Sequence, residues 1–184
     1  MMKHVRLGIY SLRFSKTAQS SVRQHLVSVF PRLWRYCLVL TGNPTQADDL
    51  AQAVCLRAIE KADAYSDDGR FDRWIFRMTQ RVWLNELRAT AVRRGGGMAT
   101  IDEIDLPDPR SDTETNILAR QVLLKIMGLP EAQRATVVLV YVEGYRYKEA
   151  ADILEVPIGT VMSRLAAARR TLNNNVAESE SIVG

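Results

Sequence analysis

The sequence predicts an all-helical fold made of two small domains joined by a flexible, acidic linker. Three observations support this prediction: apolar residues recur at helical spacing along most of the chain, no segment calls for a strand, and one Gly-, Pro- and acid-rich segment interrupts the periodicity. With 184 residues, 47% of them hydrophobic, the chain can build two small cores. We divide it into a basic, disordered arm (1–17), a helical bundle (18–95), a linker (96–112), a second helical domain (113–174) and a frayed tail (175–184).

Three long helices should form the first domain. Residues 18–41 carry apolar side chains at i, i+4, i+7 and i+8, and Pro31 should bend this helix. After a turn, Thr45 should cap a second helix that runs to about Ala64. A third helix should run from Phe71 to about Arg94, where three consecutive glycines end it.

The second domain should contain a helix over 113–127, another after Pro130, and a helix-turn-helix over Tyr147–Leu165. Pro157 lacks an amide hydrogen and clashes with a preceding turn, so the first helix of the motif should stop near Glu155. The next helix has an apolar stripe, and its other face carries hydroxyl, thioether and guanidinium groups suited to DNA contacts: Thr160, Met162, Ser163, Arg164, Arg169 and Arg170. An ordinary helical hairpin on a soluble protein would show the same spacing.

A basic stripe is predicted on the third helix. Arg77, Arg81, Asn85 and Arg88 are spaced by four, four and three residues, which places them within a sector of about 80°. Trp74 borders this stripe, and an aromatic ring beside guanidinium groups suits a single-stranded nucleic acid. The alternative is a solvated face with Trp74 closing the core.

Composition excludes several function classes. The net charge is +4, and seven arginines against two acids lie between residues 70 and 94, which fits a polyanionic partner. Cys37 and Cys55 lie in apolar stretches and are predicted to be buried free thiols of a cytoplasmic protein. No metal or cofactor is expected, and no apolar run is long enough for membrane insertion. His4 and His25 have no nucleophile beside them in the sequence, so we do not expect an enzyme.

Several motifs in this order resemble the extracytoplasmic-function (ECF) group of bacterial sigma factors, over roughly residues 20–173. Residues 35–44 and 47–58 are similar to the family's second conserved region, as are residues 71–78 and 85–88. Residues 129–134, 141–145 and 156–165 are similar to its fourth region. The resemblance implies an RNA polymerase sigma factor that binds core RNA polymerase, opens promoter DNA and acts under an anti-sigma factor that clamps both domains.

The resemblance also assigns roles to residues. It implies a polymerase contact through Asp48, Asp49 and Gln52. It implies that the loop over 63–73 accepts a flipped base, and that −10 contacts and melting involve Trp74, Arg77, Arg81, Asn85 and Arg88. Contacts to the −35 element are implied for Pro157, Thr160, Met162, Ser163, Arg164 and Arg169. The acidic linker takes the position of the family's connector, where its charge could mimic RNA or it could be a solvated tether.

The chain departs from the family pattern in the helix-turn-helix. Met162 stands where a basic residue is frequent, and Ala166 and Ala167 replace residues that are often bulky or basic, which implies a differently tuned base contact. Glu155 stands where glycine is frequent, so we expect a turn without a positive φ. Two other functions remain: a dimeric helix-turn-helix regulator that binds duplex DNA alone, and a scaffold that uses the first bundle for protein contacts.

Overall fold

The structure is a computed structural model that describes residues 3–66, 69–93 and 122–181, with side chains over 17–66, 69–92 and 122–173. The described residues form helices and turns and no strand, which confirms the predicted fold class. The first domain consists of α1 (Lys3–Thr41), α2 (Pro44–Glu60), η1 (Ala62–Ala64) and α3 (Phe71–Arg93). The second contains helical residues 122–127, then α5 (Glu131–Val137), the π-helical η2 (Val138–Val142), α6 (Tyr147–Leu154) and α7 (Ile158–Ser181).

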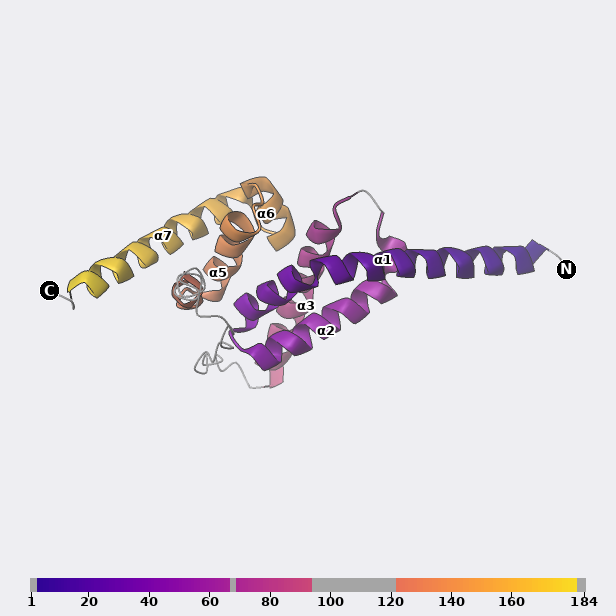
Figure 1. Cartoon of the computed structure of the whole chain (residues 1–184), viewed down its shortest axis with the longest axis horizontal. Helices are drawn as coiled ribbons and strands as arrows, with labels where there is room; N and C mark the ends of the chain where they lie inside the picture. Colours follow the sequence, from indigo (N-terminus) through magenta and orange to yellow (C-terminus); the bar gives the residue numbers. More distant parts are fainter. Residues whose placement is uncertain (1–2, 67–68, 94–121, 182–184) are drawn as a thin grey trace.

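Figure 1 shows how these helices are arranged. Helices α1 and α2 run side by side and α3 crosses behind them, while α5, α6 and α7 gather beside the carboxyl-terminal end of α1. The amino-terminal half of α1 and the carboxyl-terminal half of α7 project in opposite directions. The predicted linker over 96–112 lies outside the described residues.

Two predictions about the ends of the chain were wrong. Helix α1 begins at Lys3, so most of the segment predicted as a disordered arm is helical, and α7 continues to Ser181 through the segment predicted as a frayed tail. Neither extension contains a proline, and each added residue of an existing helix gains a hydrogen bond without a new nucleation step. The helix-forming tendency of the chain therefore extends past its apolar stripes.

The start of the second helix also differs from the prediction. Asn43, rather than Thr45, is the N-cap of α2, and its Oδ1 accepts a 3.1 Å hydrogen bond from the amide of Gln46. Pro44 then occupies the first helical position, where its missing amide hydrogen costs nothing because that amide would have no partner in the helix. By contrast, α3 begins at Phe71 as predicted and ends at Arg93, one residue from the predicted end.

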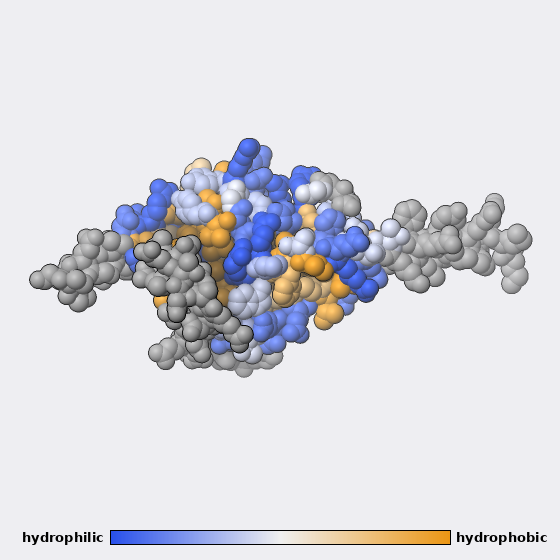
Figure 2. Space-filling view, viewed as in Figure 1, coloured by the Kyte–Doolittle hydropathy of each residue, from blue (hydrophilic) through white to orange (hydrophobic). Residues whose placement is uncertain are grey.

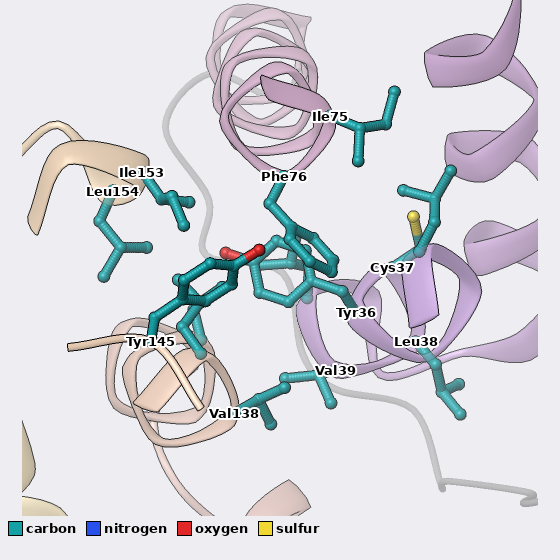
Figure 3. Close-up of a cluster of buried hydrophobic side chains, with 14 of the residues drawn as sticks. Tyr36, Cys37, Leu38, Val39, Ile75, Phe76, Val138, Tyr145, Ile153 and Leu154 are labelled. Carbon is teal, nitrogen blue, oxygen red and sulfur yellow. The ribbon is translucent and has the colours of Figure 1, made fainter. Parts of the chain in front are cut away.

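The two domains share one buried core. Figure 3 shows Tyr36 of α1, Phe76 of α3 and Tyr145 of the second domain pointing toward one another. The Phe76 ring centroid lies 5.1 Å from that of Tyr36 and 5.9 Å from that of Tyr145, both edge-on. Val138 and Leu154 of the second domain are buried in the same cluster. The domains are therefore packed against each other in this structure.

The turn of the helix-turn-helix contains an unusual backbone conformation. Helix α6 ends at Leu154, as Pro157 predicts, but Glu155 adopts a left-handed conformation with φ 55°. The expectation of a turn without positive φ was therefore wrong. Across this turn, the amide of Val156 donates a hydrogen bond to the carbonyl of Ala151. A helix end closed by this hydrogen bond places the intervening residue in the left-handed conformation, whether or not that residue is glycine.

Candidate nucleic-acid and polymerase interface

The predicted basic stripe forms one face of α3. Arg81, Asn85 and Arg88 are exposed, and Trp74 and Arg77 are half-buried at its start. The Arg88 guanidinium donates a 3.1 Å hydrogen bond to Oδ1 of Asn85, so these two side chains form a unit on the surface. The helix thus presents cationic and amide groups in a row, as its spacing predicts.

Trp74 belongs to an aromatic cluster at the beginning of α3. Its ring centroid lies 5.2 Å from that of Tyr65 and 5.5 Å from that of Phe71, and His25 of α1 stacks on Phe71 at 5.0 Å. These contacts fix the indole by packing on one side. Trp74 therefore combines features of the two alternatives offered by the sequence: its ring helps to close the core, and it also borders the basic stripe.

A pocket of about 350 Å³ opens beside this cluster. Most of its lining comes from the loop over 63–73 that is predicted to accept a base: Ala64, Tyr65, Ser66, Arg70 and Arg73. Trp74 and Arg77, from the predicted −10 contacts, also line it, so that the pocket has two aromatic rings and three arginines. A second pocket of about 290 Å³ lies along α3 toward the end of α2 and includes Arg57, Lys61, Arg81 and Asn85. Because Trp74 and Arg77 line both, the two pockets flank these side chains.

The sequence did not predict that the second domain also lines the first pocket, through Asp152 of α6. Two ion pairs accompany this approach: Arg73 of α3 pairs with Glu149 of α6, and Arg81 of α3 pairs with Glu155 at the end of α6. The Arg81 Nε donates to the Glu155 carboxylate at 2.9 Å, and this hydrogen bond lowers the pKa of Glu155. Part of the basic stripe is thus occupied by acidic side chains of the same chain.

Glu143 forms another bridge between the domains. Its side chain is only 2% exposed, and its carboxylate accepts a 2.6 Å hydrogen bond from Arg32 Nε and lies 3.7 Å from the Arg35 guanidinium, both on α1. The π-helical turn of η2 and Gly144, with φ 78°, place Glu143 at this point. Sequence reasoning missed this residue, because its partners lie more than a hundred positions away.

The predicted −35 residues, which are Pro157 and five residues of α7, divide into two groups. Pro157, Met162, Ser163 and Arg169 are exposed, whereas Thr160 and Arg164 are half-buried beside the apolar stripe. The Ser163 hydroxyl donates to the carbonyl of Thr160 at 3.0 Å. The structure therefore does not bring all six residues to one face, since Arg164 lies about 140° around the helix from Arg169.

The predicted polymerase residues lie together on an exposed face of α2. Asp48, Asp49 and Gln52 are all exposed, and the indole of Trp34 donates a 2.6 Å hydrogen bond to Asp48. Burial, together with the nearby Asp49 carboxylate, raises the pKa of Glu86 on α3. Figure 2 shows hydrophobic side chains gathered where α1 and α2 run side by side, amid a largely hydrophilic face.

Other predicted features concern cysteines, metals and membranes. Cys37 is buried and Cys55 is half-buried, both are free thiols, and burial raises the pKa of each. Over the described residues, no group of three or more His, Cys, Asp or Glu side chains could hold a metal ion. None of the described helices has the length and apolar character needed to cross a membrane.

Comparison with known proteins gives two family matches along the chain. Residues 26–93 match the family described as Sigma-70 region 2. These residues include α2, α3 and the part of α1 that packs on them. Residues 119–172 match the family described as Sigma-70, region 4, which contains the helix-turn-helix.

Several curated proteins named as ECF RNA polymerase sigma factors are similar to this chain. SigL of Mycobacterium tuberculosis is 31% identical over 149 residues, which cover 79% of this chain and 83% of SigL. SigE of Mycolicibacterium smegmatis is 30% identical over 87% of this chain, but the chain spans only 62% of SigE. SigW of Bacillus subtilis is 24% identical over 80% of this chain and 84% of SigW.

Solved structures share the fold. The sigma factor RpoE in complex with the anti-sigma factor NepR from Bartonella quintana matches with a TM-score of 0.69 and 23% identity, covering 84% of this chain and 96% of that one. CnrH in complex with the cytosolic domain of CnrY matches with a TM-score of 0.59 and 21% identity, covering 90% and 96%.

Proposed function

Because this chain belongs to the ECF RNA polymerase sigma factors, we propose that it binds core RNA polymerase and directs it to promoters with −10 and −35 elements. The observation that carries this proposal is the position of the basic stripe of α3 beside an aromatic pocket. The chain acts in the cytoplasm as a binding protein, and the polymerase supplies the chemistry of RNA synthesis.

The α3 surface supplies what promoter opening needs. Unstacking a base costs a few kcal/mol, which contacts to the unpaired strand must offset. Tyr65 and Trp74 offer rings at the pocket for base stacking, while Arg77, Arg81 and Arg88 offer charges to the backbone. We assign −10 binding and melting to this surface, with Asn85 as a hydrogen-bonding group.

The beginning of α7 supplies the −35 contact. Met162, Ser163 and Arg169 project from the exposed side of the helix, while Thr160 and Arg164 flank it closer to the core. In a helix-turn-helix the first turns of the second helix enter the major groove. We therefore assign base contacts to Met162 and Ser163, and phosphate contacts to the two arginines.

The exposed acidic face of α2 is our candidate for the polymerase contact. Asp48, Asp49 and Gln52 present two carboxylates and an amide to solvent, which suits a basic helical surface. We also propose control by an anti-sigma protein, since RpoE, whose solved structure shares this fold, is in complex with the anti-sigma factor NepR. A partner that contacts both domains should bind the intact chain more tightly than either domain alone.

Transcription with purified components tests the proposal. Core RNA polymerase is incubated with a library of promoter DNA, with and without this protein, and the transcripts are sequenced. We expect new start sites only when the protein is present. A dimeric duplex-binding regulator would instead bind DNA without core polymerase and would give no new start sites with core alone, which would refute the proposed function.

A further inference from the structure

We propose that residues 3–17, the amino-terminal segment of α1, form a second nucleic-acid contact that holds the unpaired promoter strand where it leaves the pocket beside Trp74. This segment, here called the arm helix, precedes the match to Sigma-70 region 2, which begins at residue 26, and it belongs to none of the surfaces assigned above. The inference rests on the proposed function for the identity of the DNA, and it adds a contact that neither family match contains.

Charge in this part of the chain has one sign. Residues 1–47 contain seven Lys or Arg side chains and no Asp or Glu, and four of the seven lie in the arm helix: Lys3, Arg6, Arg13 and Lys16. A solvated helix usually mixes acids and bases, which pair at i and i+4 along its surface. The arm helix contains no acid for such pairs, so its cations suit an anion from outside the segment.

The cations share a face of the arm helix with one aromatic residue. This face repeats at intervals of three, four and three residues, within a sector of about 80°: Lys3, Arg6, Tyr10 and Arg13. The combination suits a single strand, because cations bind the phosphates while an aromatic ring stacks on a base. The stripe of α3 combines the same kinds of residue at nearly the same spacing.

The arm helix does not extend the hydrophobic core of the first domain. The buried stripe of α1 runs through Val22, Leu26 and Val29. The same register, continued toward the amino terminus, contains small and polar residues: Ser15, Ser11, Gly8 and His4. In Figure 1 this part of α1 projects past the bundle. Packing within the domain therefore does not account for the basic face.

The arm helix and the α3 stripe lie on opposite sides of the base pocket. Helix α1 passes the pocket at His25, which stacks on Phe71 at 5.0 Å and lies 5.9 Å from Tyr65, a residue of the pocket lining. From this level α3 runs toward the carboxyl-terminal end of α1, because Phe76 packs on Tyr36. The arm helix projects the other way (Figure 1). A strand that follows α3 and passes the pocket therefore reaches the arm helix next.

The DNA beyond the pocket is single-stranded, because the pocket is where we place the base that leaves the duplex. Residues 3–17 form about 22 Å of helix, the length of about six nucleotides at 3.4 Å each. The arm helix can therefore hold a short stretch of the unpaired strand and keep it from pairing again.

An anionic membrane is the competing partner for a basic helix. A helix that lies on a membrane needs one wide apolar face. In the arm helix the apolar residues instead fall into two groups on opposite sides, with Val5, Ile9 and Leu12 in one and Leu7 and Phe14 in the other. This pattern, together with the position beside the pocket, favours the nucleic acid.

The first test follows the free, full-length chain as it binds a fluorescein-labelled single-stranded DNA of mixed sequence, about 12 nucleotides long, by anisotropy over a salt series. For single strands, the logarithm of affinity falls with the logarithm of salt by about 0.7 per phosphate contact. Arg6→Gln/Arg13→Gln should bind about five- to tenfold more weakly at low salt, with a slope shallower by about 1.4. Arg6→Lys/Arg13→Lys keeps both charges and should keep the wild-type slope.

The matched control, Lys125→Gln/Lys148→Gln, removes the same charge at exposed positions of the second domain. Glutamine has nearly the helix propensity of arginine and lysine, so neither variant should unfold a helix. Equal changes of slope in the arm variant and the control would show a general charge effect and overturn the inference.

Tyr10→Ala separates stacking from charge. Loss of one stacked base should weaken binding by about fivefold or more, while the salt slope stays at its wild-type value because no phosphate contact is lost. Tyr141→Ala, at a tyrosine that is 55% exposed in the second domain, should change the affinity by about twofold or less. Wild-type affinity in Tyr10→Ala would overturn this face as the contact.

The second test locates the contact on the promoter. The chain with core polymerase is titrated with two probes from a promoter found in the transcription experiment, whose non-template strand either ends at the −10 element or continues about ten nucleotides past it. Arg6→Gln/Arg13→Gln should lose about fivefold in affinity on the longer probe alone. Equal losses on both probes, or no loss on either, would overturn the inference.

Two further outcomes are distinct from these. If Arg6→Gln/Arg13→Gln abolished binding to phosphatidylglycerol vesicles and left DNA binding unchanged, the arm helix would be a membrane contact and the inference would be overturned. A wild-type chain that gives no transcription with core polymerase would refute the proposed function, while the salt series with the free chain would still show whether the arm helix binds single-stranded DNA.

Discussion

Glu155 combines an unfavourable backbone conformation with a favourable side-chain contact. A non-glycine residue in the left-handed region costs about 1 kcal/mol, and Glu155 has φ 55° while its carboxylate binds Arg81. From the sequence we inferred the opposite conformation, because a glutamate in this turn suggested a geometry that any residue could adopt. The identity of one residue could not reveal a contact to α3 that compensates for strain.

Replacing Glu155 with glycine should separate these two effects. Glu155→Gly and Glu155→Gln both remove the ion pair, but only glycine relieves the backbone. We therefore expect Glu155→Gly to exceed Glu155→Gln in unfolding free energy by about 1 kcal/mol in urea titrations. Lys148→Gly, inside α6, should destabilise the chain by about 1 kcal/mol as a control. Equal stability of the two Glu155 variants would show that the turn is not strained.

The same residue predicts a pH dependence. The hydrogen bond from Arg81 lowers the pKa of Glu155 below its ordinary value of 4.5, so its contribution to stability is present above pH 4.5 and is lost as the pH falls through the lower folded-state pKa. Because both side chains are exposed, the contribution is below about 1 kcal/mol. Urea unfolding at steps below pH 4.5 should show the wild type losing its advantage over Glu155→Gln. A constant difference across these steps would contradict the assignment.

At the scale of the element, hydrophobic periodicity predicted the helices well and their partners poorly. The stripe of α3 and the stop of α6 before Pro157 follow from local spacing and from proline geometry. The long ends of α1 and α7 did not follow, because an amphipathic pattern marks where a helix packs rather than where it ends. The pairing of Glu143 with Arg32 depends on tertiary register, which no local pattern encodes.

Helix α2 supplies a prediction about polymerase binding. Asp49→Arg should weaken the complex with core polymerase by about three- to tenfold, since a reversed charge at the rim of an interface mainly affects association and specificity. Glu60→Arg, also exposed and about three turns further along the helix, makes the same charge reversal away from the proposed contact. Binding can be followed by fluorescence anisotropy of labelled chain. If Asp49→Arg and Glu60→Arg weakened polymerase binding equally, Asp49 could no longer be assigned to the polymerase contact.

Helix α3 supplies a prediction about melting. Trp74→Ala/Arg77→Ala should lower transcription from a duplex promoter by about tenfold or more, because unstacking is no longer offset. Activity should recover substantially on a template with a pre-melted −10 bubble. Arg23→Ala, on an exposed part of α1, serves as a surface control. Since Trp74 also packs on Tyr65 and Phe71, equal losses on both templates would assign the pair a folding role.

At the scale of the whole molecule, the sequence predicted two domains but did not predict that they pack against each other. Each domain shows its own apolar stripes, which suffice to predict two cores. The structure merges them, with Tyr36 and Phe76 of one domain packed with Tyr145 of the other. An interface between domains uses the same residue types as a core, so composition alone cannot distinguish packed domains from separate ones.

Arg134 of α5 links the two domains through their backbones. The residue is 2% exposed, and its guanidinium donates to the carbonyl of Met127 at 3.2 Å and to the carbonyl of Leu40 near the end of α1 at 3.3 Å. Carbonyls in the last turn of a helix have no partner within the helix and carry partial negative charge. One buried cation thus satisfies helix ends from both domains.

Arg134→Met tests whether this buried charge stabilises the packed form. Methionine fills similar space but leaves two buried carbonyls unpaired, so we expect a loss of about 2 to 4 kcal/mol in unfolding free energy. Arg134→Lys keeps the charge but lacks the fork that reaches both carbonyls, and it should lose an intermediate amount. Burying a cation costs free energy, and this burial lowers the pKa of Arg134. Methionine removes that cost, which opposes the loss of the two hydrogen bonds. Wild-type stability in Arg134→Met would mean that this cost equals the gain from the two hydrogen bonds, and that apolar packing alone joins the domains.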